Sequence, residues 1–307
     1  MARGFGTGLA AALFATLTWG VQLPLAKDAF VAIDPFHMTA TRYLVAALCL
    51  AAILVMREGR AALRYDGRAK LAIGLGVIGI CGSPMLTFLG MSLSRAEHAV
   101  VIVSTQPMIA ALAVWILRGR RPALVTALCM LGAFTGVLLV VTKGQLDLVE
   151  SPRQVLGDCI IFVSALCWVV YTMGLGRLGG WSVWRVTVLT MLPGGLATTA
   201  VTATLVAAGV IHTPSLAAVH SVAWQMLYLT FVGVLLAMLA WNGAIQRIGG
   251  LNATLFINCM PVVTFAYRAV QGHRFETIEL VGAGLVVSAL IANNLYLRQE
   301  QRRLAGN

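Results

Sequence analysis

Long apolar runs dominate this chain, and short polar segments separate them. A transmembrane helix needs about 20 mostly apolar residues, and a window of roughly 19 residues divides the sequence into ten such runs. In the seventh, Arg185 and Pro193-Gly194-Gly195 interrupt the first half, so a shorter, tilted helix would also fit there. The ten predicted spans are Thr7–Ala26, Phe36–Met56, Leu71–Ser92, Ala99–Leu117, Ala123–Thr142, Gly157–Leu175, Trp184–Val210, Ala223–Ala244, Leu251–Val270 and Thr277–Leu297.

The composition supports lipid as the main solvent of this protein. Hydrophobic residues make up 59% of the 307 residues and charged residues only 11%, whereas a soluble domain has about a quarter of its residues charged. The net charge of +11 comes from basic clusters between the apolar runs, not from one basic face. We therefore expect an all-α polytopic membrane protein with membrane lipids around it and no nucleic acid partner.

The basic residues also predict orientation. Lys and Arg are concentrated in alternate connections, above all 57–70 and 118–121, and at the carboxyl end. The positive-inside rule then places both termini in the cytoplasm. The first apolar run continues past Trp19, Gln22 and Pro24 without a cleavage pattern, so we interpret it as a span, not as a signal peptide.

The two halves of the sequence share a set of short patterns. Five spans in each half is an odd number, so the second half is predicted to lie inverted relative to the first. The proposed repeats are residues 1–145 and 155–298, followed by a cytoplasmic tail, 299–307. The matching patterns are Leu17-Thr18-Trp19 with Leu166-Cys167-Trp168, Ser92–Arg95 with Ala244–Arg247, Pro107 with Pro261, and Gly119-Arg120-Arg121 with Gly272-His273-Arg274. Inverted repeats are typical of alternating-access transporters.

A further set of residues marks the two halves. It comprises Trp19-Gly20, Arg42, Gly157-Asp158, Trp168, and the runs Ala99–Pro107 and Ala253–Pro261. With these residues the chain resembles the drug/metabolite transporter superfamily, specifically its ten-span EamA-type exporters. The resemblance covers nearly the whole chain and is strongest to bacterial exporters of aromatic and other amino acids. The chain differs at the Gly-Glu-Arg turn that is common in the family, because Arg120 and His273 stand at the Glu positions here.

Polar and helix-breaking residues at midplane depth are the best candidates for a substrate site, because an unpaired polar group in hydrocarbon is costly. Pro107 and Pro261 each remove a helical N–H donor, which predicts a broken or kinked helix in the fourth and ninth spans. Trp19 and Trp168 suit a cavity wall, although they could equally pack between helices, and Trp241 could belong to an interfacial aromatic belt. The candidate substrate-binding residues are Trp19, Gln22, Thr87, Ser104, Gln106, Trp168, Tyr171, Trp241, Asn242 and Asn258.

Arg42 is the one basic residue well inside a span. A buried Arg usually pairs with an acid or binds helix-end carbonyls, and we expect this of Arg42; binding of a substrate carboxylate is the alternative. The acidic residues and the five His lie in loops or near span ends, the deepest acids being Asp158 and Glu279. A proton-driven exporter usually holds such a group in its pathway, so their placement favours a uniporter or facilitator.

We therefore expect a multi-pass protein of the bacterial inner membrane, a monomer or weak dimer that exports small metabolites. Amino acids, neutral, aromatic or of a broad range, are the expected substrates. A proton-coupled exporter of drugs or quaternary cations is the alternative, since aromatic walls bind cations. A membrane-embedded enzyme is a weaker alternative, because the sequence shows no catalytic dyad and no metal motif. The six Cys lack Cys-x-x-Cys spacing, and we predict no metal, cofactor or catalytic residue.

Overall fold

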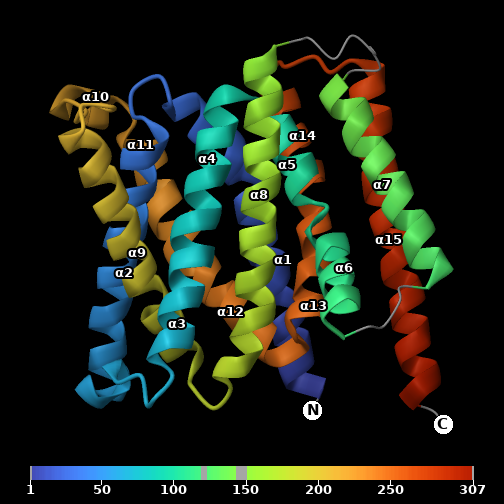
Figure 1. Ribbon diagram of the computed structural model, residues 1–307, viewed down its shortest axis with the longest axis horizontal. Helices are drawn as coiled ribbons and strands as arrows, with labels where there is room; N and C mark the ends of the chain where they lie inside the picture. Colours follow the sequence, from blue (N-terminus) through green and yellow to red (C-terminus); the bar gives the residue numbers. More distant parts are fainter. Residues whose placement is uncertain (1, 119–122, 143–150, 306–307) are drawn as a thin grey trace.

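In a computed structural model, the chain forms a bundle of helices whose axes are roughly parallel (Figure 1). The structure describes residues 2–118, 123–142 and 151–305, and these residues contain helices and connections but no strand. In the first half the helices are α1 (Ala2–Ala29), α2 (Pro35–Glu58), η1 (Arg60–Leu63), α3 (Ala69–Leu75), η2 (Gly76–Gly82), α4 (Ser83–Leu93), α5 (Ala96–Val103), α6 (Gln106–Arg118) and α7 (Leu124–Thr142).

The second half continues with a similar succession of long helices and short interruptions. Its helices are α8 (Pro152–Gly174), η3 (Leu175–Leu178), α9 (Val183–Ala207), α10 (Leu216–Ser221), α11 (Ala223–Leu227), η4 (Tyr228–Leu236), α12 (Ala237–Ile248), α13 (Gly250–Thr254), η5 (Leu255–Asn258), α14 (Cys259–Val270) and α15 (Thr277–Ala305). Among the η segments, η2 and η4 are π-helices and the others are 3₁₀-helices.

Eight helical stretches are long and apolar enough to cross a membrane, and the described parts of two more, Leu124–Gly136 and Thr277–Asn293, are apolar but shorter. Large apolar side chains on the outside of the bundle, such as Leu48, Leu131 and Phe134, are more than half exposed. A soluble protein rarely exposes so many such residues, whereas lipid accommodates them. The chain is a multi-pass membrane protein, and the count of ten spans stays a prediction.

The helices begin and end where local chemistry favours it. The Asp34 carboxylate accepts hydrogen bonds from the N–H groups of Phe36 and His37 at the start of α2, and Pro35 takes the first helical position. Gly59 ends that helix at a positive φ of 78°. The uncertain seventh span is one continuous helix, α9, with Pro193 inside it.

Both ends of the described chain lie at one end of the bundle. In Figure 1, α1 begins and α15 ends at the lower edge, which we call the terminal end. The opposite, distal end holds the end of α1, the start of α2 and the connection between α4 and α5. Placement of the terminal end in the cytoplasm stays a prediction.

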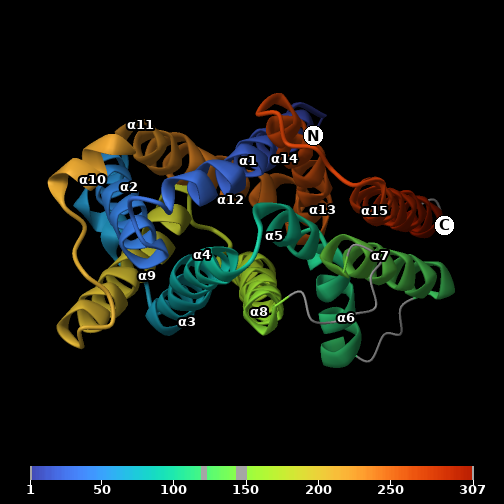
Figure 2. The ribbon, with the colours of Figure 1, turned by 90° about the horizontal axis from the view of Figure 1, so that it is seen from above.

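Helices from the two halves pack together throughout the bundle. α2 packs against α9 and α7 against α15, while α1 packs against α12 and α4 against α8. Figure 2 shows α7 and α15 side by side at one edge of the molecule. At that edge, an added Cβ on Gly136 would lie 2.6 Å from the carbonyl oxygen of Gly282, so only glycine permits this close crossing.

The predicted helix breaks are confirmed. The helix of the fourth span is interrupted between α5 and α6, directly before Pro107, and the ninth is divided by η5, directly before Pro261. The predicted turn at Gly119-Arg120-Arg121 lies outside the described residues. The two π-helices, η2 in the third span and η4 in the eighth, were not predicted. π-Helical segments are frequent at functional sites, and both of these lie beside the cavity described next.

Candidate functional site

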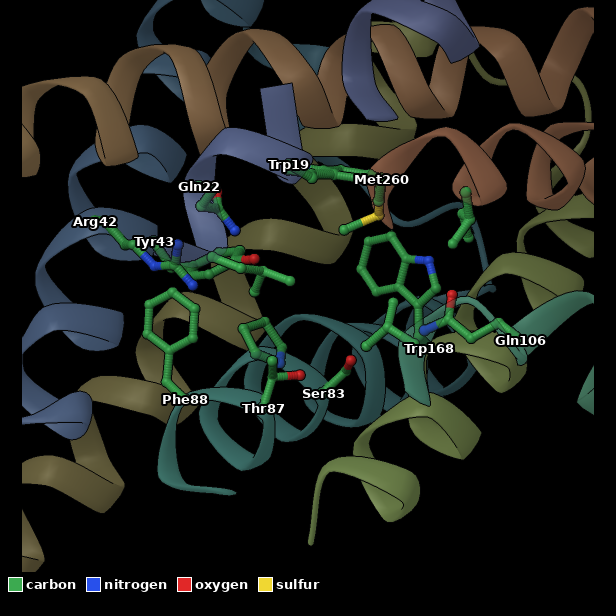
Figure 3. Close-up of a pocket in the computed structure, with 14 residues that line it drawn as sticks. Trp19, Gln22, Arg42, Tyr43, Ser83, Thr87, Phe88, Gln106, Trp168 and Met260 are labelled. Atoms are coloured by element: carbon green, nitrogen blue, oxygen red, sulfur yellow. The ribbon is translucent and has the colours of Figure 1, made fainter. Parts of the chain in front are cut away.

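A cavity lies within the bundle between α1, α2, α4 and α8, where residues of α5, α6, η5 and α14 also line it (Figure 3). Its volume is about 70 Å³, measured as the space open to the centres of water molecules. The side chains that line it are mostly apolar or aromatic, with a few polar groups among them. They are Trp19, Gln22, Leu23, Arg42, Tyr43, Ser83, Pro84, Thr87, Phe88, Val103, Gln106, Trp168, Ile257 and Met260.

A cluster of three tryptophans forms one wall of this cavity and the packing behind it. The ring centroids of Trp19 and Trp168 are 5.4 Å apart in an edge-to-face arrangement, and Trp241 lies 5.2 Å from Trp19. The Trp19 indole N–H donates to the carbonyl oxygen of Gly233 at 2.9 Å, in the π-helix η4. Trp19 and Trp168 therefore line the cavity and also pack between helices, and their role in substrate binding stays a prediction. Trp241 is fully buried, so it is not part of an interfacial belt.

Tyr171 and Asn242 support the wall without lining the cavity. The Tyr171 ring lies 5.3 Å from that of Trp168, and its hydroxyl and the Asn242 amide form hydrogen bonds of 3.1 to 3.2 Å. The Asn242 amide also donates to the Thr187 hydroxyl at 3.0 Å. This network fixes the plane of Tyr171 and, through it, the position of Trp168.

Two glutamines provide unpaired polar atoms. Gln22 and Gln106 both line the cavity, and the Oε1 atom of each is buried without a hydrogen-bond partner in the described part of the chain. A buried amide oxygen without a partner is destabilising. The Oε1 atom of Gln22 lies against Gly233 of η4. Gln106 follows the break between α5 and α6, which places it at the end of a helix and next to the cavity.

The other predicted polar residues are placed less directly. Thr87 lines the cavity, and its hydroxyl forms a hydrogen bond of 2.8 Å with Ser164. Ser104 does not line it, because its hydroxyl donates back to the carbonyl of Val100 at 2.7 Å. Asn258 is buried beside the lining residue Ile257, and its Oδ1 atom has no partner among the described residues.

Arg42 differs from the main expectation for it. The side chain is fully buried and lines the cavity, with its guanidinium carbon 4.0 Å from the centroid of the Phe88 ring and 5.0 Å from that of Tyr43. None of its three guanidinium nitrogens has a hydrogen-bond partner in the described ranges. The expectation that Arg42 pairs with an acid or with helix-end carbonyls was therefore wrong.

Acidic groups gather at the distal end and not around the cavity. Arg268 of α14 contacts Asp28 of α1 at 2.8 Å and Glu97 of α5 at 3.2 Å. Arg95 binds Glu279 of α15 at 3.0 Å. These ion pairs tie the first half of the chain to the second across the distal end. In a nearby cluster His98, which is fully buried, lies 3.2 Å from Asp158.

Several lining residues were not among the sequence candidates. Tyr43, Phe88 and Met260 are apolar or aromatic, so nothing in the sequence distinguishes them from the rest of their spans. Ser83-Pro84 gave a usable signal, a polar residue followed by a helix breaker in the third span, as Gln106-Pro107 is in the fourth.

Comparison with known proteins gives consistent results. The chain is 33% identical over 301 residues to the uncharacterized transporter YrdR of Bacillus subtilis, covering 95% of this chain and 92% of that protein. It is 28% identical to the uncharacterized transporter YyaM of the same organism, covering 91% and 90%. A protein of known crystal structure matches 97% of this chain and 99% of its own, with a TM-score of 0.66 at 20% identity, which shows a shared fold.

The family comparison covers most of the sequence in two stretches. The model of the EamA-like transporter family matches residues 6–142 and again residues 155–295. Together with the relatives above, these matches identify a transporter that acts on a small-molecule substrate in a lipid environment. The chain belongs to the EamA-like transporter family, within the drug/metabolite transporter superfamily.

Proposed function

We propose that this protein exports small metabolites, in particular neutral or aromatic amino acids, across the bacterial inner membrane by alternating access. In this proposal it has ten spans in two inverted repeats, residues 1–145 and 155–298, with both termini and the tail 299–307 in the cytoplasm. It acts as a monomer or weak dimer and carries out no enzymatic reaction.

The packing between the halves supports the inverted repeat. If the proposed membrane spans of each half are numbered in chain order, α1 and α8 are the first spans of their halves, and α4 and α12 belong to the third. The contact of α1 with α12 then has its counterpart in the contact of α8 with α4. The self-paired contacts, α2 with α9 and α7 with α15, complete a pattern that is unchanged when the halves are exchanged. Such an exchange is what alternating access requires.

The composition of the cavity wall is the observation that carries the substrate proposal. Aromatic rings and two glutamines share the lining with a single cation, Arg42, and none of the described lining residues is acidic. A wall of this kind suits a zwitterion with an apolar or aromatic side chain. The same wall disfavours quaternary cations, which the tryptophan faces could attract but Arg42 would repel.

The absence of titratable carboxyl and imidazole groups from the described lining supports facilitated transport down the metabolite gradient. Direct proton antiport needs a group in the pathway for which proton and substrate compete. The buried His98 and Asp158 lie at the distal ends of α5 and α8, and neither of them lines the cavity.

Counterflow in proteoliposomes tests the proposed function. Liposomes with purified protein are loaded with one amino acid, and uptake of the same radiolabelled amino acid is measured across a panel of neutral and aromatic amino acids. We expect saturable uptake of at least one of them, with no change when a pH gradient is dissipated. Uphill uptake that collapses with the gradient would refute the facilitator mechanism. Uptake of a quaternary ammonium cation but of no amino acid would refute the substrate class.

A further inference from the structure

The feature with the largest unexplained free-energy cost in the cavity is the guanidinium of Arg42. Burial removes its hydration, and a buried cation is normally compensated by an anion or by a full set of hydrogen bonds. Arg42 is 0% exposed, and its nitrogens Nε, Nη1 and Nη2 have no hydrogen-bond partner in the part of the chain that the structure describes. Its contacts with Phe88 and Tyr43 use the face of the guanidinium plane. A contact of that kind leaves the in-plane N–H donors unoccupied.

The position of Arg42 places its guanidinium beside the space that a ligand would occupy. Arg42 lines the same cavity as the tryptophan wall, and in Figure 3 it lies with Phe88 on one side of the space, with Trp168 and Gln106 on the other. None of the other described lining residues is charged. A guanidinium presents its N–H groups in a planar fork that matches the two oxygens of a carboxylate.

We propose that Arg42 binds the carboxylate of the transported molecule and thereby selects monocarboxylates. This inference rests on the proposed transport of amino acids and names the residue that recognises them. Gln106 lines the cavity, and its Oε1 atom, which has no partner among the described residues, is a hydrogen-bond acceptor that complements the ammonium group of an amino acid. A dicarboxylate would leave its second charge without a cation on the described wall, and an organic cation would be repelled by Arg42.

A binding experiment on the purified full-length protein tests this without requiring transport. Trp19 and Trp168 line the cavity, so tryptophan fluorescence is a suitable readout. L-Leucine, L-phenylalanine and L-methionine are titrated alongside their amides, which keep the side chain and the amine but lack the carboxylate. The variants are Arg42→Met and Arg42→Lys. Arg57→Met, the same substitution at an exposed arginine of the same helix, is the control.

We expect the wild type and Arg57→Met to bind at least one acid about 10- to 100-fold more tightly than its amide, the range expected for hydrogen bonds to a charged group. Arg42→Met should bind acid and amide equally, and Arg42→Lys should retain part of the preference because it keeps the charge without the fork. The inference is overturned if no acid binds, if wild-type protein binds amide and acid equally, or if Arg42→Met keeps the preference.

Thermal unfolding separates loss of binding from loss of folding. Because Arg42→Met removes an uncompensated buried charge, its melting temperature without ligand should equal or exceed that of the wild type. Saturating acid should raise the melting temperature of the wild type and not that of Arg42→Met. A lower melting temperature of Arg42→Met without ligand would show that Arg42 has a structural partner, and would overturn the inference. Carboxylate-dependent binding without flux in proteoliposomes would instead refute the transport proposal and leave the role of Arg42 intact.

Discussion

Replacement of Gly79 by alanine tests whether the tryptophan wall depends on the close packing of η2 against α8. A Cβ added at Gly79 would lie 2.3 Å from the Cβ atom of Tyr171 and 2.4 Å from its Cγ atom. Carbon atoms in good contact are about 3.5 to 4.0 Å apart, so either the two helices or the tyrosine must move by more than about 1 Å. Rotation of the Tyr171 side chain cannot relieve the clash, because its Cβ atom is bonded directly to the backbone.

The expected cost follows from two opposing effects. Overpacking of a well-packed interior destabilises by about 1 to 3 kcal/mol, and the higher helix propensity of alanine returns about 0.5 to 1 kcal/mol. Gly79→Ala should therefore lower the free energy of unfolding by roughly 1 to 2 kcal/mol. Displacement of Tyr171 also disturbs its hydrogen bonds with Asn242 and its contact with Trp168, so substrate flux should fall.

Gly74→Ala is the matched control, because an added Cβ at Gly74 meets nothing within 4 Å. Both variants are compared with the wild type by thermal unfolding in detergent and by counterflow in proteoliposomes with equal amounts of inserted protein. The control should keep wild-type flux and gain stability by about 0.5 to 1 kcal/mol. Equal melting temperatures and equal flux for the two variants would refute the packing of Gly79 against Tyr171.

Two further predictions concern the cavity wall and the distal end. Trp168→Ala and Gln106→Ala should each lower flux more than they lower the amount of protein in the membrane, and unchanged flux in both would place the pathway elsewhere. Arg95→Gln removes the 3.0 Å ion pair of Glu279, which is 1% exposed. The Glu279 carboxylate then keeps the hydrogen bond from the Glu276 N–H but loses its cation. This should cost about 1 to 3 kcal/mol of unfolding free energy, measured by thermal unfolding, and the double variant with Glu279→Gln should recover part of it. A double variant no more stable than Arg95→Gln would contradict that assignment.

The parts of the fold that the sequence predicted are those with strong one-dimensional signals. Long apolar runs gave the helices, and Pro107 and Pro261 marked the breaks in the fourth and ninth spans. The π-helices were not predicted, because inserting one residue into a helical turn leaves no compositional mark in a uniformly apolar run such as Tyr228–Leu236. One carbonyl of η4, that of Gly233, accepts a hydrogen bond from the Trp19 indole of another helix, a tertiary contact that composition does not reveal.

Most polar and aromatic residues in and around the cavity were among the sequence candidates, but the sequence did not show which of them line the cavity and which support its wall. Rarity in an apolar span identified Trp19, Gln22 and Gln106, and all three line the cavity. The same criterion selected Tyr171 and Asn242, which lie behind the wall and hold it. Sequence position cannot distinguish these two cases, because both kinds of residue point into the bundle. The state of Arg42 could not be predicted either, because pairing depends on which side chains from other helices approach it.

The symmetry of the scaffold and the asymmetry of its charge have different consequences. Trp19 and Trp168 meet at the cavity. In the proposed inverted repeat they hold corresponding positions, so the aromatic wall would keep its chemistry if the halves exchange conformations as proposed. The spacing that relates Trp19 to Trp168, and Ser92 to Ala244, places the counterpart of Arg42 within Met191–Gly194 of α9, where no residue is charged. Because one of these two corresponding positions carries a cation and the other does not, the carboxylate of a bound zwitterion would always lie on the Arg42 side of the cavity. In the proposed transport cycle, a zwitterion bound there would keep one orientation relative to α2 in both conformations. Its release would therefore depend on how far the rest of the wall opens and lets water reach Arg42.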